Sequence, residues 1–110
     1  MDGGGVAFSK TEPVTVWRRD QAIYTADAHG AEALIADRAL QPVPFVEPRG
    51  SGVLWQAGTE IWIQRSGSAP AVLAKDGAFP AVAEREGAGP VVVWEGSVGA
   101  DKTIFAEVLE

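Results

Sequence analysis

Val91-Val92-Val93-Trp94 is one of three short apolar runs in this chain that end on a tryptophan. The other two runs are Val14-Thr15-Val16-Trp17 and Gly52-Val53-Leu54-Trp55. The tryptophans at positions 17, 55 and 94 are therefore 38 and 39 residues apart. A nearly constant spacing of this size indicates an internal repeat, with one supersecondary unit in each copy.

The repeat extends well beyond the tryptophans. When residues 17–42 are shifted by 38 positions, they align without a gap on residues 55–80, and Pro42 then falls on Pro80. An isoleucine followed by an aromatic residue recurs in all three copies, as Ile23-Tyr24, Ile61-Trp62 and Ile104-Phe105. The third copy carries about four extra residues around Gly96–Asp101. We therefore predict a single domain, residues 1–110, with repeats at about 6–41, 42–79 and 80–110.

Each copy divides into short runs rich in Val, Ile, Leu and Trp, separated by Gly, Pro, Ser and Asp, which is typical of strands and turns. In the second copy we expect strands at 44–48, 52–57, 60–65 and 71–75. Ala31–Leu40 has a helix-like composition, but it aligns with a strand of the second copy and is predicted to be a strand. Two four-stranded copies and a three-stranded third copy give about eleven strands.

The runs at 53–55 and 91–94 are apolar on both faces. A sheet that is apolar on both faces must lie between other layers. Small four-stranded sheets that stack face to face and repeat about every 40 residues are the blades of a β-propeller. The predicted fold class is therefore all-β, a propeller-like stack of antiparallel blades whose last blade is incomplete.

The segment Val92-Val93-Trp94-Glu95 resembles the second strand of the sialidase-like, BNR-repeat β-propellers. These proteins carry an Asp-box in the turn between strands three and four, and residues 25–30 (Thr-Ala-Asp-Ala-His-Gly) are similar to it. The second copy has the shortened turn Ser66-Gly67-Ser68 at this place. The resemblance implies a propeller. The arginine triad and the Tyr/Glu nucleophile pair of sialidase-like enzymes have no residue-by-residue counterpart here, so it does not predict glycoside hydrolysis.

Three blades alone leave two apolar faces uncovered, and propellers usually close with about four to eight blades. Large exposed apolar surfaces drive association. We therefore expect a homodimer in which two chains form one six-bladed ring. We also expect the segment Gly4–Phe8 to supply the missing fourth strand of the third copy, from the same chain or from its partner. A fragment of a longer propeller is the alternative.

Composition excludes several classes of function. The net charge of −6 argues against nucleic acid and anionic membrane surfaces as partners. The chain has no cysteine and one histidine, His29, so we predict neither a metal site nor a cofactor. We see no signal peptide and no apolar run of the roughly 20 residues that span a bilayer. The cellular compartment remains open.

Ligands of propellers bind where the ring axis opens, at the loops between strands two and three and between successive blades. Charged residues gather in these loops, and an arginine fork there would suit a carboxylate or a sulfated sugar. The predicted ligand-binding residues are Arg18, Arg19, Asp20, Asp37, Arg38, Lys75 and Asp76. We expect Glu95 to be exposed, Asp27 to stabilise its own turn, and Tyr24 and Trp62 to pack between blades.

The sequence thus predicts a non-catalytic binding or scaffold module that binds itself, with carbohydrate as a candidate ligand. Two alternatives remain. One is a fragment or half-ring of a sialidase-like glycoside hydrolase, and the other is a structural repeat product without a ligand. Turnover of an aryl-glycoside would identify the first alternative, whereas a ligand-dependent rise in melting temperature would exclude the second.

Overall fold

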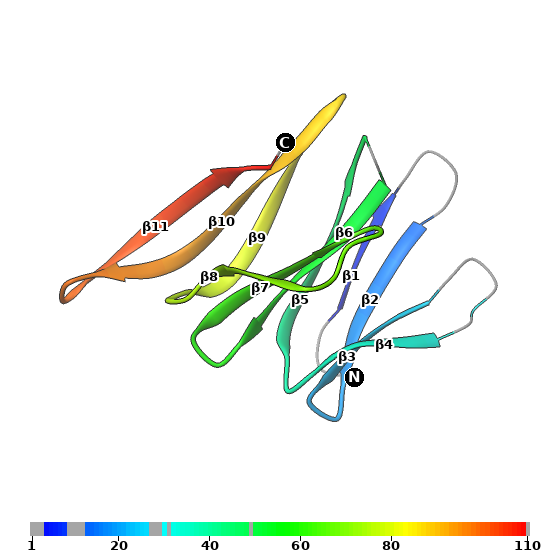
Figure 1. Cartoon of the computed structure of the whole chain (residues 1–110), viewed down its shortest axis with the longest axis horizontal. Helices are drawn as coiled ribbons and strands as arrows, with labels where there is room; N and C mark the ends of the chain where they lie inside the picture. The colour runs from blue at the N-terminus through cyan, green and yellow to red at the C-terminus, as the bar shows by residue number, and fades with distance from the viewer. Residues whose placement is uncertain (1–3, 9–12, 27–29, 31, 49, 110) are drawn as a thin grey trace.

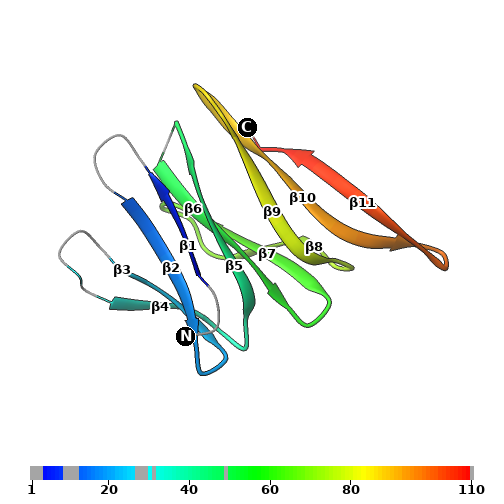
Figure 2. The same cartoon turned by 180° about the vertical axis from the view of Figure 1, so that it is seen from behind.

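The computed structural model describes residues 4–8, 13–26, 30, 32–48 and 50–109. These residues form eleven strands and no helix, arranged as three antiparallel sheets. The sheets lie side by side as successive layers in chain order (Figures 1 and 2). The predicted all-β class and the strand number are confirmed. In the part of the chain described, no helix has the length and apolarity needed to cross a membrane.

Every strand pairs with the strand that follows it within its sheet. The first sheet contains β1 (Gly4–Phe8), β2 (Pro13–Arg19), β3 (Ala22–Ala26) and β4 (Glu32–Asp37). The second contains β5 (Leu40–Glu47), β6 (Gly50–Ala57), β7 (Glu60–Arg65) and β8 (Ala71–Ala74). The third contains β9 (Ala78–Arg85), β10 (Ala88–Val98) and β11 (Asp101–Val108). The Ala-rich stretch that includes β4 is thus a strand, as its alignment with the second repeat predicted.

The prediction that Gly4–Phe8 completes the third sheet is wrong. These residues form β1, which pairs with β2 from Gly4 opposite Trp17 to Phe8 opposite Pro13. The reason is local, because consecutive strands joined by a short connection pair with each other more readily than distant ones. The extra residues of the third copy lengthen the β10–β11 hairpin, where Ser97 pairs with Lys102 and Val98 with Asp101.

The second sheet is buried on both faces. On one face Leu54 and Ile61 pack against Val92 of the third sheet. Leu109, which follows β11, belongs to the same cluster. On the other face Trp55 belongs to a second buried cluster that contains Val16 and Ile23 of the first sheet. Burial of apolar surface, worth roughly 25 cal/mol per Å², stabilises the packing of these layers. β5 packs against both β1 and β9, while the described residues do not close into a ring.

Gly52 allows the second sheet to carry a large buried side chain. Phe45 lies opposite Gly52 in the β5–β6 register and is completely buried. A Cβ at position 52 would lie 2.3 Å from Cζ of Phe45, far closer than two carbon atoms can approach. The phenyl ring therefore occupies the space above the glycine and fills the layer between the second and third sheets.

Candidate functional site

The turns that join strands two and three of each sheet lie near the connections between successive sheets. The amide of Ala39, between β4 and β5, donates to the carbonyl of Gln21 at 3.0 Å. The equivalent bond in the next repeat joins the amide of Gly77 to the carbonyl of Thr59 at 2.7 Å. We call this side of the molecule, which carries residues 20–21, 38–39, 58–59, 75–77 and 99–100, the turn end.

A surface pocket of about 180 Å³ opens at the turn end between the second and third sheets. Polar and apolar atoms contribute about equally to its surface. The polar side chains that line it belong to Gln56, Thr59, Asp76, Glu95, Ser97 and Lys102. Hydrogen-bonding groups at the rim of a concave site are the usual means of orienting a small polar ligand.

The side chains of this pocket are held by bonds to neighbouring loops. The Asp76 carboxylate accepts a hydrogen bond from the amide of Ser97 at 3.2 Å, which ties the β8–β9 connection to the third sheet. Lys102 Nζ lies 3.0 Å from Glu95 Oε1 across the β10–β11 hairpin. The Lys102 side chain is largely exposed, so this ion pair adds little stability and leaves both groups accessible to a ligand.

Phe79 is an exposed aromatic residue beside the pocket. It follows Ala78, which lines the pocket, and it is 60% exposed. Its φ is +54°, a conformation that bulky residues rarely adopt. The amide of Phe79 donates a hydrogen bond to Oε1 of Gln56 at 3.1 Å, which ties the start of β9 to the second sheet. Gln41, at the equivalent position one repeat earlier, has the same φ of +54°, so this conformation belongs to the connection between successive sheets.

Of the seven predicted binding residues, Asp76 lines this pocket and the other six lie outside its described lining. Lys75 is adjacent and contributes its carbonyl, which accepts a hydrogen bond from the Thr59 hydroxyl at 3.4 Å. Phe79 was not among the predicted binding residues, because the prediction for these loops relied on charged side chains. Its position at a connection between repeats was the signal that pointed to the surface.

The remaining predicted residues lie around the turn end of the first sheet. Arg18 Nε donates to the carbonyl of Ala39 at 3.0 Å, so this guanidinium stabilises the connection to β5. Asp20 and Arg38 are exposed turn residues with φ of +52° and +54°. The Asp37 carboxylate accepts a hydrogen bond from the Arg38 amide at 3.0 Å.

The Arg19 side chain lies on the outer face of the first sheet. Its guanidinium forms an ion pair with Glu32 and lies 4.5 Å from the ring centroid of Tyr24. The hydrogen bond to Glu32, more than any other interaction, raises the pKa of Arg19. Tyr24 stacks on Trp17 at 6.2 Å, on the face turned away from the second sheet. Within the part of one chain that the structure describes, no second sheet covers Tyr24, so its predicted packing between blades stays a prediction, whereas Trp62 does pack against the cluster between the first two sheets.

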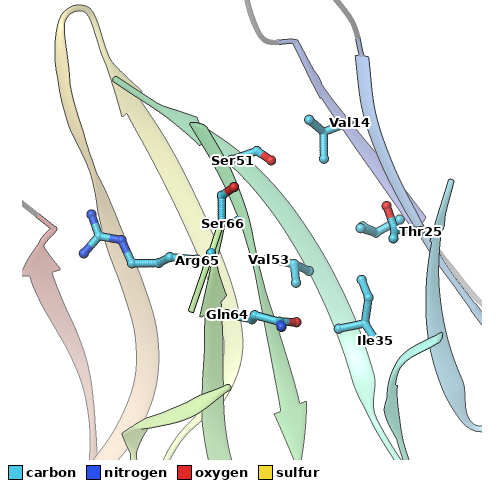
Figure 3. A pocket seen from close by; sticks show the side chains of 11 residues that line it. Val14, Thr25, Ile35, Ser51, Val53, Gln64, Arg65 and Ser66 are labelled. Carbon is cyan, nitrogen blue, oxygen red and sulfur yellow. The ribbon is translucent and has the colours of Figure 1, made fainter. Parts of the chain in front are cut away.

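A second pocket, of about 190 Å³, lies between the first two sheets at their other end. Figure 3 shows Thr25 and Ile35 on one side of it and Val53 on the other, while Arg65 points away. Thr25 occupies the repeat position of Ile63, which is buried between the second and third sheets. The Thr25 hydroxyl already donates to the carbonyl of Thr15 at 2.8 Å. We therefore interpret this pocket as a gap left by a smaller side chain.

Among the residues that the structure describes, no three His, Cys, Asp or Glu side chains gather to form a metal site. Asp27 and His29, in the turn that resembles an Asp-box, lie outside the described residues. No family model, curated protein or solved structure matches this chain.

Proposed function

We propose that this chain is a non-catalytic binding module that forms half of a six-bladed β-propeller by associating with a second copy. Its proposed ligand is a carbohydrate, bound in the turn-end pocket beside Phe79. The observation that carries the proposal is an exposed aromatic residue, Phe79, beside a surface pocket of mixed polarity between two sheets.

The repeat supports association through the two outer faces. Between the second and third sheets, Leu54 and Ile61 meet the face that bears Trp94. On the uncovered face of the third sheet, Val93 and Ile104 occupy the positions of Leu54 and Ile61. On the uncovered face of the first sheet, Trp17 occupies the position of Trp94.

The third sheet of one chain can thus pack against the first sheet of another chain. The residues in contact would be equivalent to those that join the second and third sheets within one chain. Any ring of whole chains contains a multiple of three sheets, and six is the multiple within the usual range of about four to eight. Two copies related by a two-fold axis would bury both faces at once. The gain is substantial, because each large aromatic side chain can bury roughly 150–250 Å².

The ligand class follows from the chemistry of the pocket. Sugars present hydroxyl groups, which suit the carboxylates of Asp76 and Glu95 and the ammonium of Lys102. They also present apolar C–H faces, which pack on an exposed aromatic ring such as Phe79. An extended anionic polymer is disfavoured by the net charge of −6.

Light scattering after size exclusion tests the ring. We expect a mass of about twice 11.5 kDa for the wild-type chain and the monomer mass for Ile104→Arg. Val98→Arg is the matched control, because Val98 is 60% exposed against 68% for Ile104 but lies near the hairpin tip, away from the closing face. A monomeric wild-type chain, or equal masses for the two variants, would exclude the ring.

Calorimetric titration with a panel of mono- and disaccharides tests the ligand. We expect at least one sugar to bind, and Phe79→Ala to weaken its binding roughly tenfold, as truncation of an aromatic anchor does. Val72→Ala, on the outer strand β8, is the control and should bind normally. Failure of every sugar, or equal binding by Phe79→Ala, would contradict a carbohydrate site here. Turnover of an aryl-glycoside would contradict the non-catalytic assignment.

A further inference from the structure

The outer edge of β11 differs from the corresponding edges of the other two sheets. β11 spans eight residues and pairs with β10 in an uninterrupted register from Val91–Val108 to Val98–Asp101. In the part of the chain that the structure describes, no strand pairs with its other edge. A long edge strand without proline or a bulge presents a row of free backbone donors and acceptors to an added strand.

The repeat shows what covers this edge in the other sheets. β3 and β7, which hold the same repeat position as β11, each pair with a fourth strand, β4 and β8. Both pairs contain a register irregularity at the same place, between Ile23 and Tyr24 and between Ile61 and Trp62. Two independent copies thus accept the same kind of strand in the same way.

The covering strands share a short sequence pattern. Leu34-Ile35-Ala36 in β4 corresponds to Val72-Leu73-Ala74 in β8. In each strand the middle residue is the one skipped in the register, and its side chain packs against the buried cluster shared with the next sheet. The alanine lies opposite the isoleucine of the neighbouring strand, and the first aliphatic residue lies opposite the aromatic one.

The residue after β11 makes the same backbone hydrogen bond as the residue after β7. After β7 the amide of Ser66 donates to the carbonyl of Ser51 at 2.8 Å. After β11 the amide of Leu109 donates to the carbonyl of Pro90 at 2.9 Å. These four residues occupy equivalent repeat positions, so the end of β11 has the geometry that precedes a fourth strand in the second sheet.

We propose that the free edge of β11 is a strand-addition site for an extended segment of the pattern aliphatic–aliphatic–Ala, supplied by a different, partner protein. The segment runs antiparallel to β11, with its alanine opposite Ile104 and its first aliphatic residue opposite Phe105. Backbone hydrogen bonds supply affinity in this mode of recognition, and alternate side chains supply specificity. The inference depends neither on the ring nor on the sugar site.

A synthetic peptide with the sequence of residues 69–75, Ala-Pro-Ala-Val-Leu-Ala-Lys, serves as the probe for the full-length chain. We expect it to slow amide hydrogen exchange in residues 101–108 by about tenfold or more. In the control peptide both Val72 and Leu73 are replaced by proline. Proline lacks an amide donor and is excluded from paired positions of a sheet, so this peptide should leave exchange unchanged.

A graft raises the effective concentration of the strand and provides a second readout. Residues 67–75, appended after Glu110, reproduce the β7–β8 connection with one additional residue. We expect the graft to raise the melting temperature and abolish protection by the free peptide, whereas the same graft with the two prolines should do neither. Equal effects of the two peptides, or of the two grafts, would overturn the proposal. So would β11 amides that, without any peptide, are already as protected as those of β7, because a second copy would then cover the edge.

Discussion

Ile61 and Ile104 occupy the same position in successive repeats, yet Ile61 is completely buried and Ile104 is 68% exposed. Each lies in the third strand of its sheet, before an aromatic residue that stacks on the repeat tryptophan. The difference is the neighbouring layer. Ile61 faces the third sheet, whereas Ile104 faces outward from the last sheet of the chain.

This difference predicts unequal effects on stability. Ile61→Ala should lower the free energy of unfolding by about 2–5 kcal/mol, because it removes buried methyl groups and leaves a cavity. Ile104→Ala, measured in the chain at concentrations low enough to keep it monomeric, should change it by less than about 0.5 kcal/mol, as exposed substitutions do. Urea denaturation followed by tryptophan fluorescence gives both values. Comparable losses in the two monomeric variants would mean that Ile104 is covered within one chain.

Gly52 and Phe45 should behave as a coupled pair. Gly52→Ala should destabilise the protein by about 1–3 kcal/mol, because the new methyl group overlaps the Phe45 ring. Phe45→Leu removes the ring atoms that clash and leaves only the close contact with the Gln64 carbonyl oxygen, 2.8 Å from that Cβ. The double variant should therefore be more stable than the sum of the single changes predicts. A double-mutant cycle by chemical denaturation measures this coupling. Simple additivity would show that the ring does not occupy the space above position 52.

At position 79 glycine should give a more stable protein than alanine, the reverse of their usual order in a strand. In an ordinary strand alanine is more stable than glycine, but a residue with a positive φ costs roughly 1–2 kcal/mol unless it is glycine. Because Phe79 has a φ of +54°, we expect Phe79→Gly to be more stable than Phe79→Ala by about 1 kcal/mol. Thermal melts of the two variants provide the comparison. A higher melting temperature for Phe79→Ala than for Phe79→Gly would indicate that this backbone relaxes out of the left-handed region.

Thr25→Ile should stabilise the protein by about 0.5–2 kcal/mol, as cavity-filling substitutions do. The second repeat already has isoleucine at this position, and the pocket between the first two sheets has room for the added carbon atoms. Chemical denaturation measures the change. Ala83→Ile, at an exposed site on β9 in the third sheet, away from this pocket, is the control for increased strand propensity alone. A gain no larger than that of the control would mean that the pocket is not filled.

Much of the fold was predictable from the repeat. The spacing of Trp17, Trp55 and Trp94 divided the chain into three units, and the alignment of β4 with β8 overrode an alanine-rich composition. The candidate site was less predictable. Asp76 lines the pocket, but Arg18 and Arg19 bond to other groups in the structure, and Phe79 was recognised from its exposure.

The sequence by itself determined the number of strands, their order along the chain and the residues that recur in each repeat, because strand formation and turn chemistry depend on neighbouring residues. Only the tertiary structure decided that Gly4–Phe8 pairs with β2, that Ile61 is buried while Ile104 is not, and that Gly52 accommodates Phe45. The physical reason is that burial and close approach depend on which layer lies opposite a side chain. Equivalent residues in successive repeats carry the same local pattern but face different neighbours.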